Sequence, residues 1–195
     1  MRVLVTGAGG QLGRDVAIAC EAAGDEVVAC DHATLDVADR DAVLGTILST
    51  APDAVIHCGA WTAVDACEAD PDRAYAVNAL GTRWVADACR RGGAHLTYVS
   101  TDYVFDGTKD GPYLEWDAPN PQSVYGASKL GGEREVGPEA AIVRTSWVCG
   151  EYGANMVKTI LRLAGEHPTL SFVDDQRGHP SFCADLAPVL RRLAL

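Results

Sequence analysis

The sequence lacks several features that mark broad classes of protein. No apolar run among its 195 residues approaches the length of a membrane span, so we expect no membrane association. It has no Lys/Arg run, and 27 acidic residues against 16 basic ones give a formal charge of −11, which argues against a nucleic-acid partner. Its five histidines are scattered without metal-ligand spacing, so we expect no metal site.

Cysteine is present, but not in a pattern that predicts disulfides. The seven cysteines are odd in number, widely spaced and mostly inside apolar runs, and none belongs to a Cys-x-x-Cys pair. This usage is typical of reduced thiols in a protein core. The first expected strand begins at Arg2, which leaves no room for a signal peptide. We therefore expect a cytoplasmic protein.

Short apolar runs alternate with longer helical patterns along the chain. The expected strands are Arg2–Thr6, Glu26–Cys30, Ala54–Cys58, Leu96–Ser100, Ala141–Arg144 and Leu170–Val173. The expected helices are Gln11–Ala23, Asp39–Thr50, Pro71–Arg91, Ser123–Glu135, Asn155–Gly165 and one that begins near Cys183. Continuously apolar strands are covered on both faces, so this alternation predicts an α/β fold with a doubly wound parallel sheet.

A glycine-rich segment follows the first expected strand. Gly7, Gly10 and Gly13 stand at three-residue intervals. Such glycines permit a tight turn, let backbone N–H groups approach a pyrophosphate, and let the helix pack closely on the strand. The alternative is an ordinary turn in a chain that contains many glycines. The place of the glycine segment between an apolar strand and an amphipathic helix favours dinucleotide binding.

Asp31 bears on the choice of cofactor because it closes the second expected strand. A carboxylate there accepts hydrogen bonds from the adenosine ribose and repels a 2′-phosphate, which favours NADH over NADPH. Arg14 lies close to the glycine loop in sequence and could meet a phosphate, so NADPH stays open. The alternative for Asp31 is an acid in a solvated turn.

Tyr125 and Lys129 stand four residues apart at the start of an expected helix, so their side chains share one face. A carbonyl reductase must give a proton to the oxygen that hydride attack leaves negative. Tyrosine can donate it, although its ordinary pKa of about 10 is high. A nearby ammonium lowers that pKa, so this spacing predicts an acid pair. The alternative is a surface pair in which the lysine stem packs on the ring.

The motifs together resemble the extended short-chain dehydrogenases and, more narrowly, the dTDP-4-dehydrorhamnose reductases. The resemblance covers nearly the whole chain. It rests on the glycine loop, Ser100-Thr-Asp-Tyr-Val-Phe105, Val124-Tyr-Gly-Ala-Ser-Lys129, Lys129-Leu-Gly-Gly-Glu133, Arg144-Thr-Ser-Trp-Val148 and Asp174-Asp-Gln-Arg-Gly-His-Pro180. It implies a Rossmann fold and reduction of the C4 ketone of dTDP-4-dehydro-L-rhamnose by NADH or NADPH.

The resemblance also implies residue roles. Tyr125 would donate the proton, Lys129 would hold the nicotinamide ribose, and Thr101 would bind the carbonyl oxygen. The implied sugar-nucleotide contacts are Thr101, Asp102 and Trp147. The cofactor contacts, with the glycines of the loop included, are Gly7, Gly10, Gln11, Leu12, Gly13, Asp31, Asp36, Val37, Ala60, Trp61, Thr62, Tyr125 and Lys129.

Members of this family continue beyond the length of this chain, so we expect a C-terminal lobe to be missing. We expect a dinucleotide-binding domain at 1–145, and at 146–195 the remaining sheet and helix elements with a partial substrate-binding region. The expected partner is a dTDP-sugar, and a homodimer is compatible with the sequence. Two other functions stay open: a sugar-nucleotide epimerase or dehydratase, and a non-catalytic cofactor-binding regulatory subunit.

Overall fold

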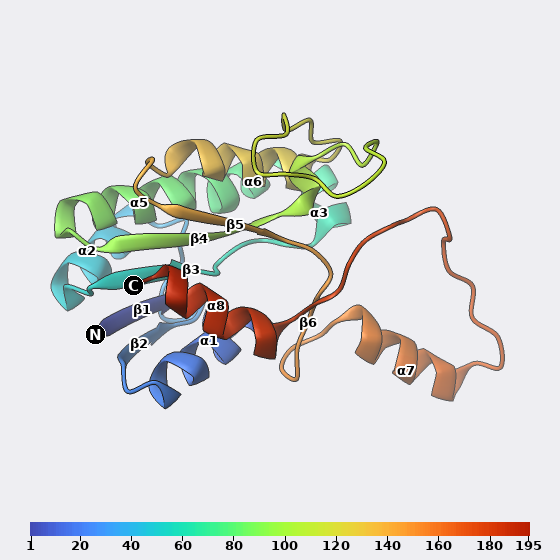
Figure 1. Ribbon diagram of the computed structural model, residues 1–195, viewed down its shortest axis with the longest axis horizontal. Helices are drawn as coiled ribbons and strands as arrows, with labels where there is room; N and C mark the ends of the chain where they lie inside the picture. The colour runs from blue at the N-terminus through green and yellow to red at the C-terminus, as the bar shows by residue number, and fades with distance from the viewer.

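The computed structural model describes residues 1–195 and is built on a parallel sheet of five strands (Figure 1). The strands are β1 (Arg2–Thr6), β2 (Glu26–Cys30), β3 (Ala54–His57), β4 (His95–Thr101) and β5 (Ala141–Thr145). They lie in the order β2-β1-β3-β4-β5, so the chain changes direction across the sheet between β1 and β3. The predicted doubly wound parallel sheet is confirmed.

Helices cover both faces of this sheet (Figure 1). Helices α1 (Gln11–Ala22) and α8 (Cys183–Leu193) lie on one face, and α2 (Arg40–Thr50), α5 (Gly81–Gly92) and α6 (Val124–Glu135) lie on the other. Successive strand residues point to opposite faces. Thus Val3 and Val5 pack in the cluster that includes α1 and α8, whereas Leu4 packs in the cluster of α2 and α5. Burial on both sides explains why the strands read as unbroken apolar runs.

Local sequence sets several helix ends as expected. The Asp39 carboxylate caps α2 by accepting hydrogen bonds from the backbone N–H groups of Asp41 and Ala42. The turn after α1 contains Gly24 with φ +83°, a left-handed conformation that favours glycine. These caps explain why the predicted boundaries of α1 and α2 fall within one residue of the observed ones.

The predicted helix from Pro71 to Arg91 is confirmed, since the chain is helical without a break from α4 (Pro71–Tyr75) through η1 (Ala76–Leu80) to α5. Two features were not predicted: η1 is a π-helical turn, and a separate helix, α3 (Val64–Ala69), precedes α4. The wide π-helical turn carries Asn78, whose fully buried side chain hydrogen-bonds the backbone of the loop after β3. Such turns are frequent at functional sites, and sequence periodicity does not reveal them.

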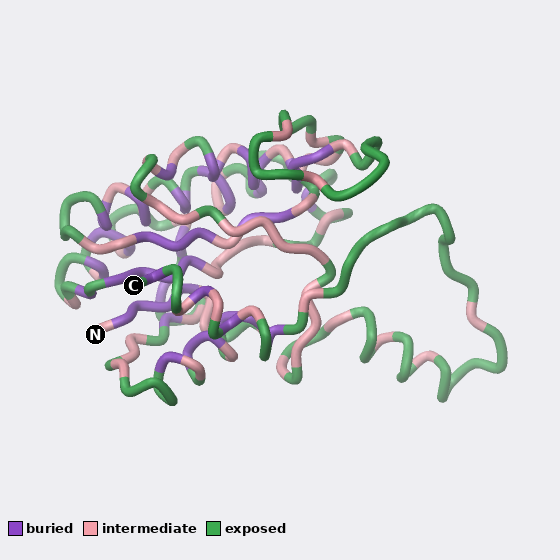
Figure 2. The backbone as a smooth tube through the Cα atoms, in the orientation of Figure 1, coloured by how far each residue is buried: buried purple, intermediate pink, exposed green.

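The prediction of a strand at Leu170–Val173 is wrong. These residues form irregular backbone, Val173 is 69% exposed, and no neighbouring strand pairs with them. An apolar run becomes a strand only where its N–H and C=O groups find a ladder. Figure 2 shows that this stretch and helix α7 (Met156–Glu166) are mostly exposed.

The last part of the chain returns to the main body. A short second sheet pairs β6 (Val148–Cys149) with β7 (Ser181–Phe182), and α8 then packs beside α1. The Arg191 guanidinium donates to the buried Asp25 carboxylate at the end of α1, which holds α8 in place. No helix is both long enough and apolar enough to cross a membrane.

Candidate active site

The predicted site residues follow the carboxyl ends of the parallel strands, which all meet at one edge of the sheet. Thr6 ends β1, Asp31 follows β2, Ala60 follows β3 and Thr101 ends β4. Helix α1 begins at this edge, beside the point between β1 and β3 where the chain changes direction. In open α/β sheets, ligands bind at such a point.

The glycine loop is shaped for close backbone approach. Gly7 has φ +66°, and a Cβ at Gly13 would lie 2.7 Å from the Gly7 carbonyl carbon, so neither position accepts a side chain without movement. Gly10 is the N-cap of α1, and it has no side chain to bond the first helical N–H groups, among them those of Gln11 and Leu12.

Those free N–H groups distinguish α1 from three other helices, each of which begins with a polar side-chain cap. Asp39 caps α2, Ser123 caps α6 and Asn155 caps α7, each through its side chain. The first turn of α1 also contains no acidic residue. An uncapped helix start without nearby negative charge fits the pyrophosphate of a dinucleotide.

Asp31 lies next to this loop, and a Cβ at Gly9 would be 3.1 Å from the Asp31 Cβ. The Asp31 carboxylate accepts hydrogen bonds from the Thr34 hydroxyl and backbone N–H, and these bonds hold its pKa below the usual value. Asp31 is therefore charged at neutral pH. The guanidinium of Arg14 lies 4.1 Å from the centre of the Tyr152 ring.

Two further predicted cofactor positions follow β2. Asp36 is half-exposed, and its carboxylate accepts a hydrogen bond from the backbone N–H of Ala38. Val37 is buried and lies against Gly81 at the start of α5, where a Cβ would be 3.0 Å from the Val37 carbonyl oxygen. The close approach of α5 places the segment after β2 beside the loop that follows β3.

The loop of Ala60, Trp61 and Thr62 is joined to the helix of Tyr125 by a residue that sequence reasoning missed. The Trp61 N–H donates to Asn78 Oδ1 at 2.8 Å, and Asn78 Nδ2 donates to the Trp61 carbonyl oxygen at 3.0 Å. Asn78 Nδ2 also donates to Ser128 Oγ on α6. The only sequence signal was an asparagine within an apolar helical run.

Tyr125 is buried in the first turn of α6. Burial raises its pKa to about 12, while the nearby Thr101 side chain acts in the opposite direction. The Thr101 hydroxyl also donates to Asp102 Oδ1 at 3.2 Å, and burial raises the pKa of Asp102. The structure therefore brings Thr101, Asp102 and Tyr125 close together at the carboxyl edge of the sheet.

Lys129 shares the buried face of α6 with Tyr125, but its ammonium contacts a different group. Lys129 Nζ donates to the Val99 carbonyl oxygen at 2.7 Å and lies 4.1 Å from the centre of the Tyr98 ring. Burial lowers the pKa of Lys129 to about 7. The expectation that the pKa of Tyr125 lies below its ordinary value is wrong in this structure, because burial dominates and the ammonium is bonded to β4.

Trp147 lies beyond β5, two residues after Thr145, which pairs with Thr101 across the sheet. Its φ of +45° is left-handed, a rare conformation for an aromatic residue. The indole is 47% exposed and lies against Gly178, where a Cβ would come within 2.5 Å of the indole nitrogen. The ring is therefore near the edge that carries Thr101 and is held by the segment before β7.

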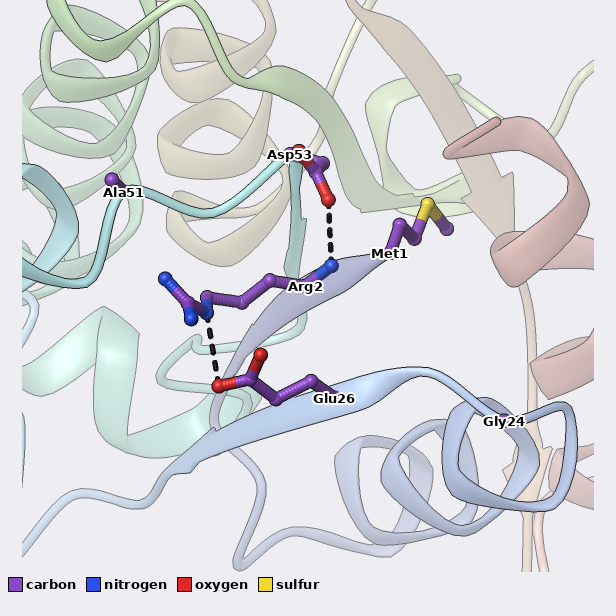
Figure 3. A pocket seen from close by; sticks show the side chains of 6 residues that line it. All are labelled: Met1, Arg2, Gly24, Glu26, Ala51 and Asp53. Atoms are coloured by element: carbon purple, nitrogen blue, oxygen red, sulfur yellow. Dashed lines mark hydrogen bonds and ion pairs between the residues drawn. The ribbon is translucent and has the colours of Figure 1, made fainter.

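A surface depression of about 390 Å³ lies at the opposite edge of the sheet, at the amino ends of the strands (Figure 3). Its charged groups bond one another: Arg2 pairs with Glu26 at 3.0 Å, and the Arg2 backbone N–H donates to Asp53. None of the predicted site residues lines it. No group of three or more His, Cys, Asp or Glu side chains is arranged to hold a metal ion.

Comparison with known proteins identifies the family of the chain and several similar proteins. The family described as "RmlD substrate binding domain" matches residues 1–195. The dTDP-4-dehydrorhamnose reductase of Aggregatibacter actinomycetemcomitans is 45% identical over 99% of this chain and 67% of that protein. Curated relatives of this kind are longer, and the chain spans about two thirds of their length.

Solved structures agree. The dTDP-4-dehydrorhamnose reductase of Bacillus anthracis, in complex with NADP, is 41% identical with a TM-score of 0.95 over 99% of this chain and 70% of that one. The match to the UDP-glucose 4-epimerase of Brucella ovis, in complex with NAD, has a TM-score of 0.86 and covers 99% of this chain and 72% of that one. At 23% identity this match shows the fold alone. The chain therefore belongs to the RmlD substrate binding domain family.

Proposed function

We propose that this chain carries the active site of a reductase that converts the C4 ketone of dTDP-4-dehydro-L-rhamnose to the alcohol of dTDP-L-rhamnose, with NADH or NADPH as the reductant. The observation that carries the proposal is that Thr101 and Tyr125 lie close together at the same edge of the sheet as a glycine loop whose helix start is uncapped. The likeness to reductases of that name supports the choice of substrate.

The residues of the carboxyl edge have distinct roles in this proposal. Gly7, Gly10 and Gly13 keep the loop free of side chains, and the N–H groups of Gln11 and Leu12 bind the pyrophosphate. Asp31 binds the adenosine ribose. Asp36, Val37, Ala60, Trp61 and Thr62 line the remainder of the cofactor site. When bound, the nicotinamide supplies the hydride that adds to C4.

The proton comes from the chain. Tyr125 donates its phenolic proton to the C4 oxygen, and the Thr101 hydroxyl hydrogen-bonds the same oxygen and orients the carbonyl. With a pKa near 12, Tyr125 is fully protonated at neutral pH and able to donate. The Lys129 ammonium, once turned from Val99 towards the ribose, stabilises the phenolate that the transfer leaves behind. Asp102 and Trp147 contact the sugar nucleotide.

Among the two cofactors, NADH is the one we propose as preferred. The charged Asp31 carboxylate repels a 2′-phosphate, and the guanidinium of Arg14 lies over the Tyr152 ring. The ratio of kcat/KM for NADH to that for NADPH should exceed one. Replacement Asp31→Ser should lower this ratio by about tenfold, equivalent to the loss of one charge contact. A wild-type preference for NADPH would contradict this proposal.

The test of the reaction is Tyr125→Phe, assayed in the complete gene product with dTDP-4-dehydrorhamnose. We expect a fall in kcat of about 10²- to 10⁴-fold, because the ring stays in place while its proton is lost. Tyr103→Phe is the matched control, since this neighbouring ring meets Tyr125 edge-on and has no role in proton donation. Absence of turnover by the unaltered protein with either cofactor would refute the proposal.

Further measurements separate the two other functions. An epimerase or dehydratase recycles its cofactor, so NAD retained through purification would point to that class. A regulatory subunit would keep its biological effect in Tyr125→Phe but lose it when Gly10 is replaced by a residue that blocks the loop. Steady consumption of NADH is the result expected of the reductase.

A further inference from the structure

A buried carboxylate lies one helical turn beyond Lys129. Glu133, on α6, accepts hydrogen bonds from Ser100 Oγ at 2.6 Å, Arg144 Nε at 2.9 Å and Arg144 Nη2 at 2.7 Å. Its side chain is 5% exposed, and that of Arg144 is 22% exposed. Ser100 and Arg144 face each other in the register of β4 and β5. One carboxylate thus ties the helix to two strands.

The hydrogen-bonded group of Glu133, Ser100 and Arg144 lies next to the proposed reacting groups in sequence. Ser100 immediately precedes Thr101 on β4, and Glu133 follows Lys129 by four residues on α6. Tyr125, Lys129 and Glu133 therefore form one stripe along the helix. A shift of α6 along β4 would move Tyr125 relative to Thr101, and the three hydrogen bonds of Glu133 oppose that shift.

The geometry also restricts Arg144. Its two donors bind the two oxygens of Glu133 in the planar, bidentate arrangement that fixes both side chains. The guanidinium lies 4.8 Å from the centre of the Phe105 ring, in the segment that follows Thr101. Removal of one partner would leave a buried charge uncompensated, so the pair is sensitive to single substitutions.

We propose that Glu133 is a positioning residue of the active site, which holds α6 in register with β4 and places a carboxylate one helical turn from the Lys129 ammonium. The effect on positioning and charge concerns this chain alone, while its consequence for the reaction rate rests on the proposed reductase function. Arg144 and Ser100 act through Glu133 and contact no reacting atom in the proposal.

The surroundings of Lys129 explain why the charge of Glu133 matters. The titratable and charged groups that face Lys129 or its partners are His57 and Cys58 from the β3 end, Tyr98 from β4, Tyr125 and Glu133 from α6, Asp102 beside Tyr125, and Arg144 from β5 beside Glu133.

Most of these groups are neutral when Lys129 titrates. Burial lowers the pKa of His57 to about 3, and its ring bonds the hydroxyls of Thr6 and Thr82. Burial raises the pKa of Cys58 to about 12, so the thiol carries no charge near pH 7. Burial lowers the pKa of Lys129 to about 7, and Cys58 and then the Glu133 carboxylate oppose this change. Because the Cys58 thiol is neutral near pH 7, Glu133 is the one of these two groups that carries a charge there.

Direct titration of Lys129 is the first experiment. The chain has three lysines, so ¹³Cε-labelled lysine gives a simple spectrum in which the buried Lys129 signal separates from exposed Lys109 and Lys158. In Glu133→Gln we expect the Lys129 midpoint to fall by about one pH unit. The control Glu135→Gln removes a charge from a half-exposed position on the same helix and should leave it unchanged. An unchanged midpoint in a folded Glu133→Gln protein would overturn the proposal.

A second variant allows for failure of Glu133→Gln to fold. The double change Glu133→Gln with Arg144→Met removes both partners and leaves no unpaired buried charge. The Lys129 midpoint should still fall, because Glu133 and not Arg144 favours the charged form of Lys129, and by less than in the single variant, because the positive charge of Arg144 is removed as well. A midpoint equal to that of the wild type would count against the proposal as strongly as in the single variant.

The pH profile of the reaction is the last measurement. If charged Lys129 is needed, activity is lost as pH rises through its pKa, so the alkaline limb of kcat should move to lower pH by about one unit in Glu133→Gln, with KM within about twofold. A purely structural role would lower the amount of active enzyme without moving the limb. If no turnover occurs at all, the reductase function fails, while the titration still decides the role of Glu133.

Discussion

Helices α6 and α7 are similar in length, and both begin with a side-chain cap, yet their surroundings are opposite. α6 buries seven of its residues, whereas α7 buries none. The sequence of α7 has the clearer apolar stripe, with Met156, Ile160 and Leu161 exposed, and Figure 2 shows the helix apart from the main body. An amphipathic pattern therefore indicates a helix but does not supply the surface that covers it.

The burial of α6 depends on small residues as well as on apolar ones. A Cβ at Gly126 would lie 2.9 Å from the Tyr103 carbonyl carbon, and one at Gly132 would lie 2.5 Å from the Asn78 carbonyl oxygen. At Gly165 on α7 a Cβ would meet nothing. Glycine brings α6 close enough to the sheet for Tyr125 and Lys129 to be buried against β4.

The largest difference between the helices should come from leucine truncation. Leu130 on α6 is 7% exposed and packs with Val104 and Phe105, while Leu161 on α7 is 69% exposed. We expect Leu130→Ala to lower the free energy of unfolding by about 2–4 kcal/mol and Leu161→Ala to change it by less than about 0.5 kcal/mol. Urea denaturation measures both. Equal losses would mean that α7 is covered in solution.

Glycine substitution should give a smaller effect with opposite signs in the two helices. Gly126→Ala should lower the free energy of unfolding by about 1–3 kcal/mol, because the helix must move away from Tyr103. Gly165→Ala should raise the stability of α7 by about 0.5–1 kcal/mol, because alanine is the better helix former and has room. Circular dichroism with urea titration measures the first effect, and amide hydrogen exchange within α7 measures the second. A stabilising Gly126→Ala would contradict the close approach described for α6.

Removal of the helix caps should have the smallest effect. Ser123→Ala deletes the hydrogen bond to the Gly126 N–H, and Asn155→Ala deletes the one to the Lys158 N–H. For Ser123→Ala we expect the free energy of global unfolding to fall by about 1 kcal/mol. For the second we expect faster amide exchange limited to α7, because no buried residue couples this helix to global unfolding. Exchange that spreads into the sheet after Asn155→Ala would show that α7 is coupled to the core.

Much of the fold follows from local sequence. The predicted Arg2–Thr6 and Glu26–Cys30 strands agree with β1 and β2 residue by residue, since unbroken apolar runs bounded by turns have few alternatives. Caps at Asp39 and Ser123 place the starts of α2 and α6. The shared face of Tyr125 and Lys129 also follows from sequence, because four residues span about one helical turn.

Other features depend on contacts between distant segments, and sequence patterns alone do not contain them. Whether Leu170–Val173 forms a strand depends on a neighbouring ladder, which this structure does not place beside it. The contact of Asn78 with Trp61 requires the π-helical turn to pack on the loop after β3, and the bond of Lys129 to Val99 requires α6 to pack on β4. The sequence by itself determined which residues carry the chemistry and which strand each of them follows along the chain. Only the tertiary structure decided which groups lose water and which partners they gain, because burial and charge compensation depend on the whole packed neighbourhood.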